Sequence, residues 1–303
     1  LAAPALARGP LDPLVIDSAA AWLVHVDIEA ALNTDLGRFL AKALNVDLPG
    51  LADLSQKLAI DPQRDIKGLT IYGAGSAEEE GVAVLVSSSA VDQLHTRLTE
   101  AGLADVAVIE RPYGAAYAAT IGGDRWYAAV RPADRGDLRL LVLTRSPDRL
   151  DRAVGVLSDP ERSMARSPDH PLRMQPKTDA FVVAAAHQTG SAAGSQIARN
   201  MRTMHMEMGE SSSPEGATVF VDVSIDAGTA ENAGTMQQIF QGGVAMVQLQ
   251  ARDNPAIVDV AKAVRVVADG STLRVTARKA ATKVIEAMEL MRTQRGGPAA
   301  SGE

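Results

Sequence analysis

The chain has 303 residues, of which 46% are hydrophobic and 22% charged, as in folded globular proteins, and it could form one large domain or two ordinary ones. A net charge of -7 and the lack of any basic stripe argue against nucleic-acid binding, because phosphate recognition needs clustered Lys and Arg. The absence of cysteine excludes disulfides and thiol catalysis, and no apolar run approaches the roughly 20 residues that span a bilayer.

The chain begins with LAAPALARGP, an Ala- and Pro-rich stretch without an initiator methionine. Ala5-Leu6-Ala7 matches the small-x-small pattern of a signal-peptidase site, and the residues before it resemble the end of an apolar segment. A trimmed, unstructured terminus would have the same composition, so that explanation stays open. We expect an exported protein, periplasmic or extracellular, in which residues 1–15 form a flexible tail that could include the end of a signal peptide.

The first half alternates strand and helix patterns. AWLVHV at 21–26 predicts a strand, Asp27 stands where a helix N-cap is expected, and apolar residues at helical spacing then predict an amphipathic helix over 28–43. Further elements are expected in this order: a short helix at 51–58, strands at 66–73 and 82–87, a helix at 91–101, short strands between 106 and 144, and a helix at 147–157.

The pattern restarts after a segment, 159–177, that contains four prolines and predicts a linker. AFVV at 180–183 resembles AWLV at 21–24. Glu80-Gly81-x-x-Val84-x-Val86 recurs as Glu215-Gly216-x-x-Val219-x-Val221, and LRLLVLTRSPDRLDRAVGVL aligns with STLRVTARKAATKVIEAMEL. Each match is weak by itself, but their common order indicates a degenerate internal duplication.

The expected fold class is therefore α+β. Two degenerate repeats would each form a mostly antiparallel sheet with helices packed on one face. The first repeat would span 16–158 and the second 178–292, joined by the linker at 159–177 and followed by a flexible C-terminal tail at 293–303.

MRTMHMEM, residues 201–208, contains four of the ten methionines and one of the five histidines. Met201, Met204 and Met208 have the spacing of a buried helix face, which favours core packing by flexible thioethers. The alternative is a copper site, because thioether and imidazole ligands suit Cu(I) and His205 would share that side of the helix. No second Met or His cluster completes such a site, so we predict no metal ligands here.

The other candidate motifs have simpler explanations. His25-Val26-Asp27-Ile28-Glu29 resembles a string of metal ligands, but strand alternation followed by a helix cap accounts for it. Gly73-Ala74-Gly75 lacks the third glycine of a phosphate loop and is followed by acidic residues. Neither GxSxG nor HExxH occurs, and there is no Walker lysine. We therefore assign no catalytic, cofactor-binding or metal residues and expect no cofactor.

LAIDPQRDIKGLTIYG at 58–73, together with AWLVHVDIEAAL at 21–32, resembles a loose group of uncharacterised exported bacterial proteins. The resemblance covers mainly the first half of the chain. It implies export and a duplicated α+β fold, and that group has no established function.

The function expected from these patterns is that of an exported, non-enzymatic binding or interaction protein. Its partner would be an unknown ligand or an envelope protein. Strands outnumber the helices that could cover them, so one sheet face is either open to a partner or buried between the repeats. Tyr113 and Tyr117 are expected on the same face. A carboxylate-using hydrolase of the cell envelope and a copper binder that uses Met201–Met208 stay open as alternatives.

Overall fold

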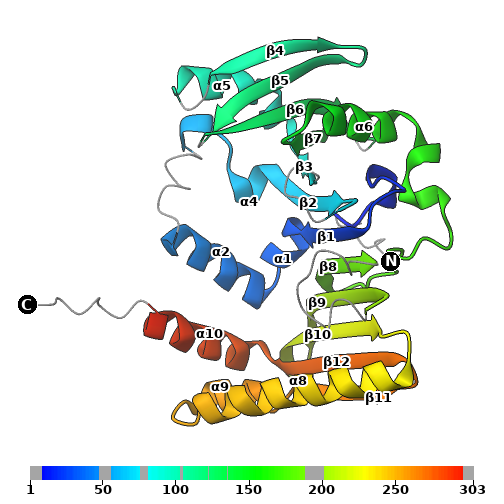
Figure 1. The fold of residues 1–303 in the computed structure, drawn as a ribbon. Coiled ribbons are helices and arrows are strands. Elements are labelled where there is room, and N and C mark those ends of the chain that lie inside the picture. Colours follow the sequence, from blue (N-terminus) through cyan, green and yellow to red (C-terminus); the bar gives the residue numbers. More distant parts are fainter. Residues whose placement is uncertain are drawn as a thin grey trace, which may run out of the picture.

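The computed structural model describes residues 9–47, 56–75, 81–102, 105–121, 123–134, 136–187 and 201–295. These residues form a 12-stranded sheet in the order β11-β12-β10-β9-β8-β1-β2-β3-β7-β6-β5-β4, in which neighbouring strands pair antiparallel (Figure 1). The fold is mixed α+β, as expected. Its helices lie on both faces of the sheet, whereas the sequence pattern predicted one.

The first half contains the expected elements. They are η1 (Pro13–Val15), β1 (Trp22–Asp27), α1 (Ile28–Leu32), α2 (Asp35–Asp47), α4 (Pro62–Asp65), β2 (Ile66–Gly73), β3 (Val82–Ser87), η3 (Ser89–Gln93), α5 (Leu94–Glu100), β4 (Val106–Arg111), β5 (Gly114–Ile121), β6 (Asp124–Pro132), β7 (Arg139–Thr144) and α6 (Pro147–Ser158). The bounds of β2 and β3 are those predicted. Most of the short helix expected at 51–58 lies outside the described residues.

The described residues of the second half form the following elements. After η4 (Pro160–Arg162) and η5 (Met164–Arg166) come β8 (Ala180–His187), β9 (Thr203–Ser213), β10 (Gly216–Asp226), α8 (Ala230–Gln250), α9 (Pro255–Ala261), β11 (Arg265–Asp269), β12 (Thr272–Ala280) and α10 (Ala281–Arg295).

The helix predicted over 28–43 is broken after Leu32. Asn33 caps the end of α1, and the hydroxyl of Thr34 accepts a hydrogen bond from the N–H of Gly37 at the start of α2. A Cβ at Gly37 would lie 1.9 Å from the carbonyl oxygen of Ala31, so only glycine permits this close turn between the two helices.

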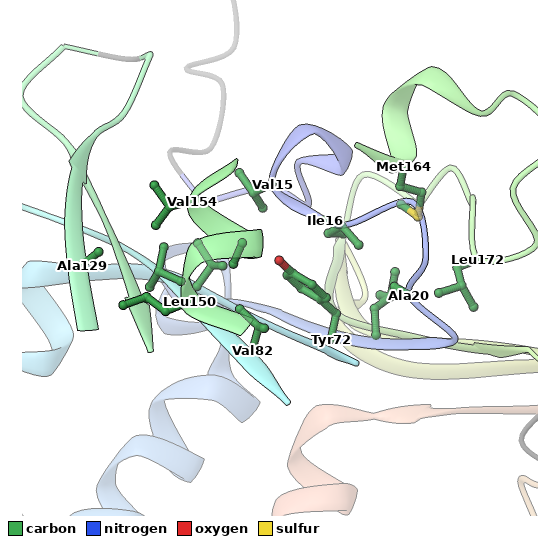
Figure 2. Close-up of a cluster of buried hydrophobic side chains, with 14 of the residues drawn as sticks. Val15, Ile16, Ala20, Tyr72, Val82, Ala129, Leu150, Val154, Met164 and Leu172 are labelled. Atoms are coloured by element: carbon green, nitrogen blue, oxygen red, sulfur yellow. The ribbon is translucent and has the colours of Figure 1, made fainter. Parts of the chain in front are cut away.

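One face of the sheet carries the largest core cluster. Leu23, Tyr72, Val84, Val142 and Ala129 lie on this face and pack under α6, as Figure 2 shows for several members. The irregular segments at both ends of the first half complete the cluster with Val15, Ile16, Met164 and Leu172. Residues 9–15 and 159–177, expected as tail and linker, therefore supply buried core side chains.

The opposite face is covered by the remaining helices. Leu36 of α2 and Ala281 of α10 pack over Phe181 and Val219, while Met236 of α8 packs over neighbouring strands with Ile225, Ala233 and Leu273. The placement of the helices follows from the registers, because residues paired directly across two strands point to the same face.

The two halves meet in the middle of the sheet. β1 pairs antiparallel with β8, from Trp22↔Ala186 to Val26↔Val182, so a single sheet runs through both halves. On one side of this junction the order is β1-β2-β3-β7-β6, and on the other it is β8-β9-β10-β12-β11. The hairpin strands β5 and β4 extend only the first half.

The helix predicted for the methionine-rich segment is wrong. Residues 203–213 form β9, which pairs with both β8 and β10. Met204, Met206 and Met208 also recur at every second position, the period of a strand, and pairing on both sides favours the strand. Residues 197–200 of the predicted helix lie outside the described part of the chain.

Candidate functional site

A cavity of about 310 Å³ lies between α5 and the β4–β7 end of the sheet. We call it the α5 cavity. Residues of η3 and α5 form its roof, residues of strands β4 to β7 form its floor, and Leu58 forms one wall. The lining residues are Leu58, Val91, Leu94, His95, Leu98, Val106, Tyr117, Ala119, Ile121, Trp126, Ala128, Val130, Leu141 and Leu143.

The strand sequences explain why this space is not filled. Tyr117, Ala128 and Leu143 are paired across β5, β6 and β7, so their side chains share the face below α5. Ala119 and Ala128 project only a methyl group where larger side chains would reach the helix. Leu94 and Leu98, one helical turn apart, face this floor from above.

Three rings supply the flat surfaces of the cavity. The ring of His95 stacks on that of Tyr117, with centroids 4.5 Å apart and planes inclined by 18°. Trp126 carries the guanidinium of Arg145 at 5.2 Å from its ring centroid, and Arg145 is held in turn by Asp124 at 2.6 Å. These contacts restrain the aromatic rings before any ligand arrives.

The wall next to α5 is fixed by one side chain. Arg97 donates hydrogen bonds to the carbonyl oxygens of Leu58 and Ala59, at 2.7 and 2.8 Å. Ala59 has φ +47°, a left-handed conformation that is uncommon for alanine. Arg97 thus holds a strained turn against the helix, with Leu58 directed at the cavity.

The residues that line the cavity are suited to binding an apolar molecule and not to acid-base or nucleophilic catalysis. Among the lining residues there is no carboxylate, Lys or Arg, and the polar atoms belong to His95, Tyr117 and Trp126. A volume of about 310 Å³ lies at the lower end of the range for small-molecule pockets, and apolar walls with a few polar groups are typical of them.

The structure does not bring the candidate residues of the first strand together. His25 is buried on the α6 side of the sheet, where its Nδ1 lies 2.9 Å from the hydroxyl of Thr70, and burial lowers its pKa to about 4. Asp27 caps α1 by accepting from the N–H of Ala30, as predicted. Within the described ranges, no three His, Asp or Glu side chains are grouped to hold a metal ion.

The methionines and the histidine of the methionine-rich segment lie on opposite faces of the sheet. Met204 packs against the cluster of Ile225 and Met236, and Met208 against that of Leu36 and Phe181. His205 points the other way, with its Nε2 2.9 Å from the carbonyl oxygen of Pro171. The ligand set assumed for copper therefore does not converge on one point.

Three buried carboxylates are held by structural groups. Asp17 accepts from Arg152 and from the N–H of Ala19; Asp65 accepts from Arg64, from Ser88 and from the N–H of Asp61. Glu210 accepts from the first backbone N–H groups of α2. These hydrogen bonds explain why the carboxylates are buried, without a catalytic role.

The α5 cavity itself was not predicted. The prediction that Tyr113 and Tyr117 share a face is wrong, because Tyr113 lies in the turn before β5 and its hydroxyl donates to Asp151 of α6, at 2.8 Å. Only the alternation of large rings with alanines in GAAYAATI and DRWYAAV signals a sheet face with missing volume.

Comparisons of the chain with protein-family models, with curated proteins and with solved structures found no match in any of the three. The helices of the described ranges are each too short or too polar to cross a bilayer.

Proposed function

We propose that this protein is a non-enzymatic binding protein that holds a small apolar ligand in the α5 cavity. The observation that carries the proposal is a space of about 310 Å³ whose walls are almost entirely aliphatic and aromatic. Water in such a space has few hydrogen-bonding partners, so an apolar ligand displaces it at little cost.

The small side chains of the floor support the proposal. One larger aliphatic side chain at Ala119 or Ala128 would fill part of the space, yet both positions are alanine. Ala119 is buried, but its methyl group is too small to fill the space above it. The restrained rings of His95, Tyr117 and Trp126 supply preformed surfaces for a flat or branched apolar molecule.

The proposal includes an origin by duplication. It is supported by the same strand order on each side of the β1–β8 junction and by the three sequence matches, which fall on β1 and β8, on β3 and β10, and on β7 and β12. The repeats have diverged, because α6 covers one face of the sheet and α10 the other. Export, which rests on Ala5-Leu6-Ala7 outside the described residues, stays a prediction, as does an envelope partner.

Binding can be measured with the two tryptophans of the chain. In a Trp22→Phe background, Trp126 alone reports on the cavity, and energy transfer to N-phenyl-1-naphthylamine measures binding of an uncharged apolar probe. Ala128→Leu fills the floor, and we expect it to weaken binding at least about tenfold, because overpacking excludes the probe.

Ala115→Leu is the matched control, since Ala115 is exposed on β5 and does not line the cavity. It should leave affinity unchanged. Equal probe affinity in the Ala128→Leu and Ala115→Leu proteins would contradict the proposal, as would a wild-type protein that binds no probe up to its solubility limit.

A further inference from the structure

Helix α8 leaves an uncharged apolar surface uncovered at the end of the sheet opposite to the α5 cavity (Figure 1). Its inner side packs on the sheet through Ala233 and Met236. On the outer side Ile239 is 49% exposed, Met246 60% and Leu249 69%. No charged residue occurs between Glu231 and Arg252, and the polar residues exposed on the helix are uncharged, among them Gln238, Gln241 and Gln250. Desolvating uncharged groups costs less than desolvating charges, so this side of the helix can be covered by a protein surface.

The uncovered residues follow a regular pattern. Thr235, Ile239, Gly242, Met246 and Leu249 are separated by alternate steps of four and three, and none of them is buried. That is the spacing of the contact seam in a two-stranded coiled coil. The seam, from Thr235 to Leu249, extends over most of the 21-residue helix, a length of roughly 20 Å at about 1.5 Å per residue.

A groove runs beside this seam. It has a volume of about 550 Å³ and is formed by α8, α9 and α10, with Val247, Ile257, Val260 and Met291 among its apolar walls. The same chain therefore presents an apolar ridge, made by Met246 and Leu249, next to an apolar groove of the size to receive such a ridge, and Ile239 lies in the wall of that groove.

Two adjacent glycines lie in the middle of α8, Gly242 in the seam and Gly243 in the wall of the groove. Both are exposed, and a Cβ at either would meet no atom of the described residues within 4 Å, so packing inside the described part of the chain does not require them. Glycine in a helix interior costs about 1 kcal/mol relative to alanine, so two adjacent glycines weaken α8 without improving its own packing. Close approach by another helix backbone is what small residues at such a position permit.

One pair of opposite charges at the two ends of the helix supports a second copy of the chain as the partner. Glu231 and Arg252 are equally far in sequence from the midpoint between Gln241 and Gly242. When two copies of α8 pack antiparallel about a two-fold axis at this position, each Glu231 faces the Arg252 of the other copy. Arg252 is 75% exposed and contacts the neighbouring Asp253 only at 3.8 Å, so it can reach across.

We propose that α8 is the interface of a two-fold symmetric homodimer, in which two copies of the helix cross antiparallel at Gly242. Each copy would place its ridge against the groove of the other, an isologous contact in which one patch serves both subunits. Ligand binding in the α5 cavity is independent of this assembly.

The absence of cysteine gives a direct test. In a Gly242→Cys variant the two introduced thiols meet at the axis, and mild oxidation should join most of the protein into a disulfide-linked dimer. A Val108→Cys variant is the control, because Val108 is 58% exposed on the edge strand β4 at the far end of the sheet. It should give little cross-linked dimer under the same conditions.

Light scattering after size exclusion supplies the second measurement. The wild-type chain should elute at twice its mass of 31.7 kDa, and Met246→Lys should convert it to monomer, with Val108→Lys unchanged. Circular dichroism on each variant separates dissociation from unfolding. A wild-type monomer at about 100 µM, or a Met246→Lys dimer, overturns the proposal. A monomer that binds phosphatidylglycerol vesicles through α8 would assign the surface to lipid instead and overturn it equally.

Discussion

Glu210 of β9 accepts a hydrogen bond from the backbone N–H of Leu36, at 2.9 Å, across 174 residues of sequence. Its second carboxylate oxygen accepts from the N–H of Asp35, also at 2.9 Å. A buried side chain from the second half of the chain thus caps a helix of the first half, where negative charge is favoured by the helix dipole.

Replacing Glu210 by alanine should lower the free energy of unfolding by about 1–3 kcal/mol, because two N–H groups at the start of α2 lose their acceptor in a buried place. Urea denaturation followed by circular dichroism measures the change. Glu215→Ala, on the exposed turn between β9 and β10, is the control and should stay within about 0.5 kcal/mol of wild type. Equal losses in both variants would show that the cap contributes nothing.

The buried imidazole of His25 predicts a loss of stability in mild acid. Burial lowers its pKa from 6.5 to about 4, so between these values the unfolded chain binds a proton that the folded protein does not. Stability should therefore fall as pH decreases through this window, by on the order of 3 kcal/mol in total.

A His25→Asn variant keeps a group that can hydrogen-bond to Thr70 and removes the titration. Its free energy of unfolding, measured from pH 7 to pH 4, should depend less on pH than that of the wild type. His187→Asn is the control and should retain the wild-type slope. Parallel pH profiles for His25→Asn and wild type would count against the assignment to His25.

Gly209 is required by close packing. A Cβ there would lie 2.0 Å from the carbonyl oxygen of Asp179 and 2.6 Å from the ring of Phe220. Gly209→Ala should therefore cost more than about 2 kcal/mol in a thermal or urea melt. At Gly234, on α8, an added Cβ would meet no atom of the described residues within 4 Å, and Gly234→Ala should stabilise by up to about 1 kcal/mol. The prediction is wrong if the two variants change stability in the same direction.

The methionines of β9 should be replaceable by leucine. In a Met204→Leu, Met208→Leu double variant we expect stability within about 1.5 kcal/mol of wild type, since the two side chains are similar in volume. Anaerobic titration with Cu(I) should give equally weak binding to both proteins. Tight binding to the wild type that the double variant loses would restore the copper hypothesis.

Local patterns predicted the elements that local interactions decide. β2 and β3 alternate clearly and have the predicted bounds, and α6 begins as expected, with Ser146 accepting from the N–H of Arg149 and Pro147 in the first turn.

Non-local pairing explains the failures. Met201, Met204 and Met208 satisfy a helical period, while Met204, Met206 and Met208 satisfy a strand period, and the sequence contains no local signal that chooses between them. The hydrogen bonds of β9 to β8 and β10 decide the matter. The α5 cavity is equally non-local, since α5 meets β6 and β7 only in the folded chain.

The pairing of β1 with β8 makes the protein a natural candidate for fragment complementation. β8 is buried along most of its length. A fragment that contained only β1 or only β8 would therefore expose an unpaired, apolar edge strand, which is prone to aggregation. Two fragments divided near Lys177 should therefore aggregate when produced alone and reassemble when produced together, which would let reporter halves be fused at the cut.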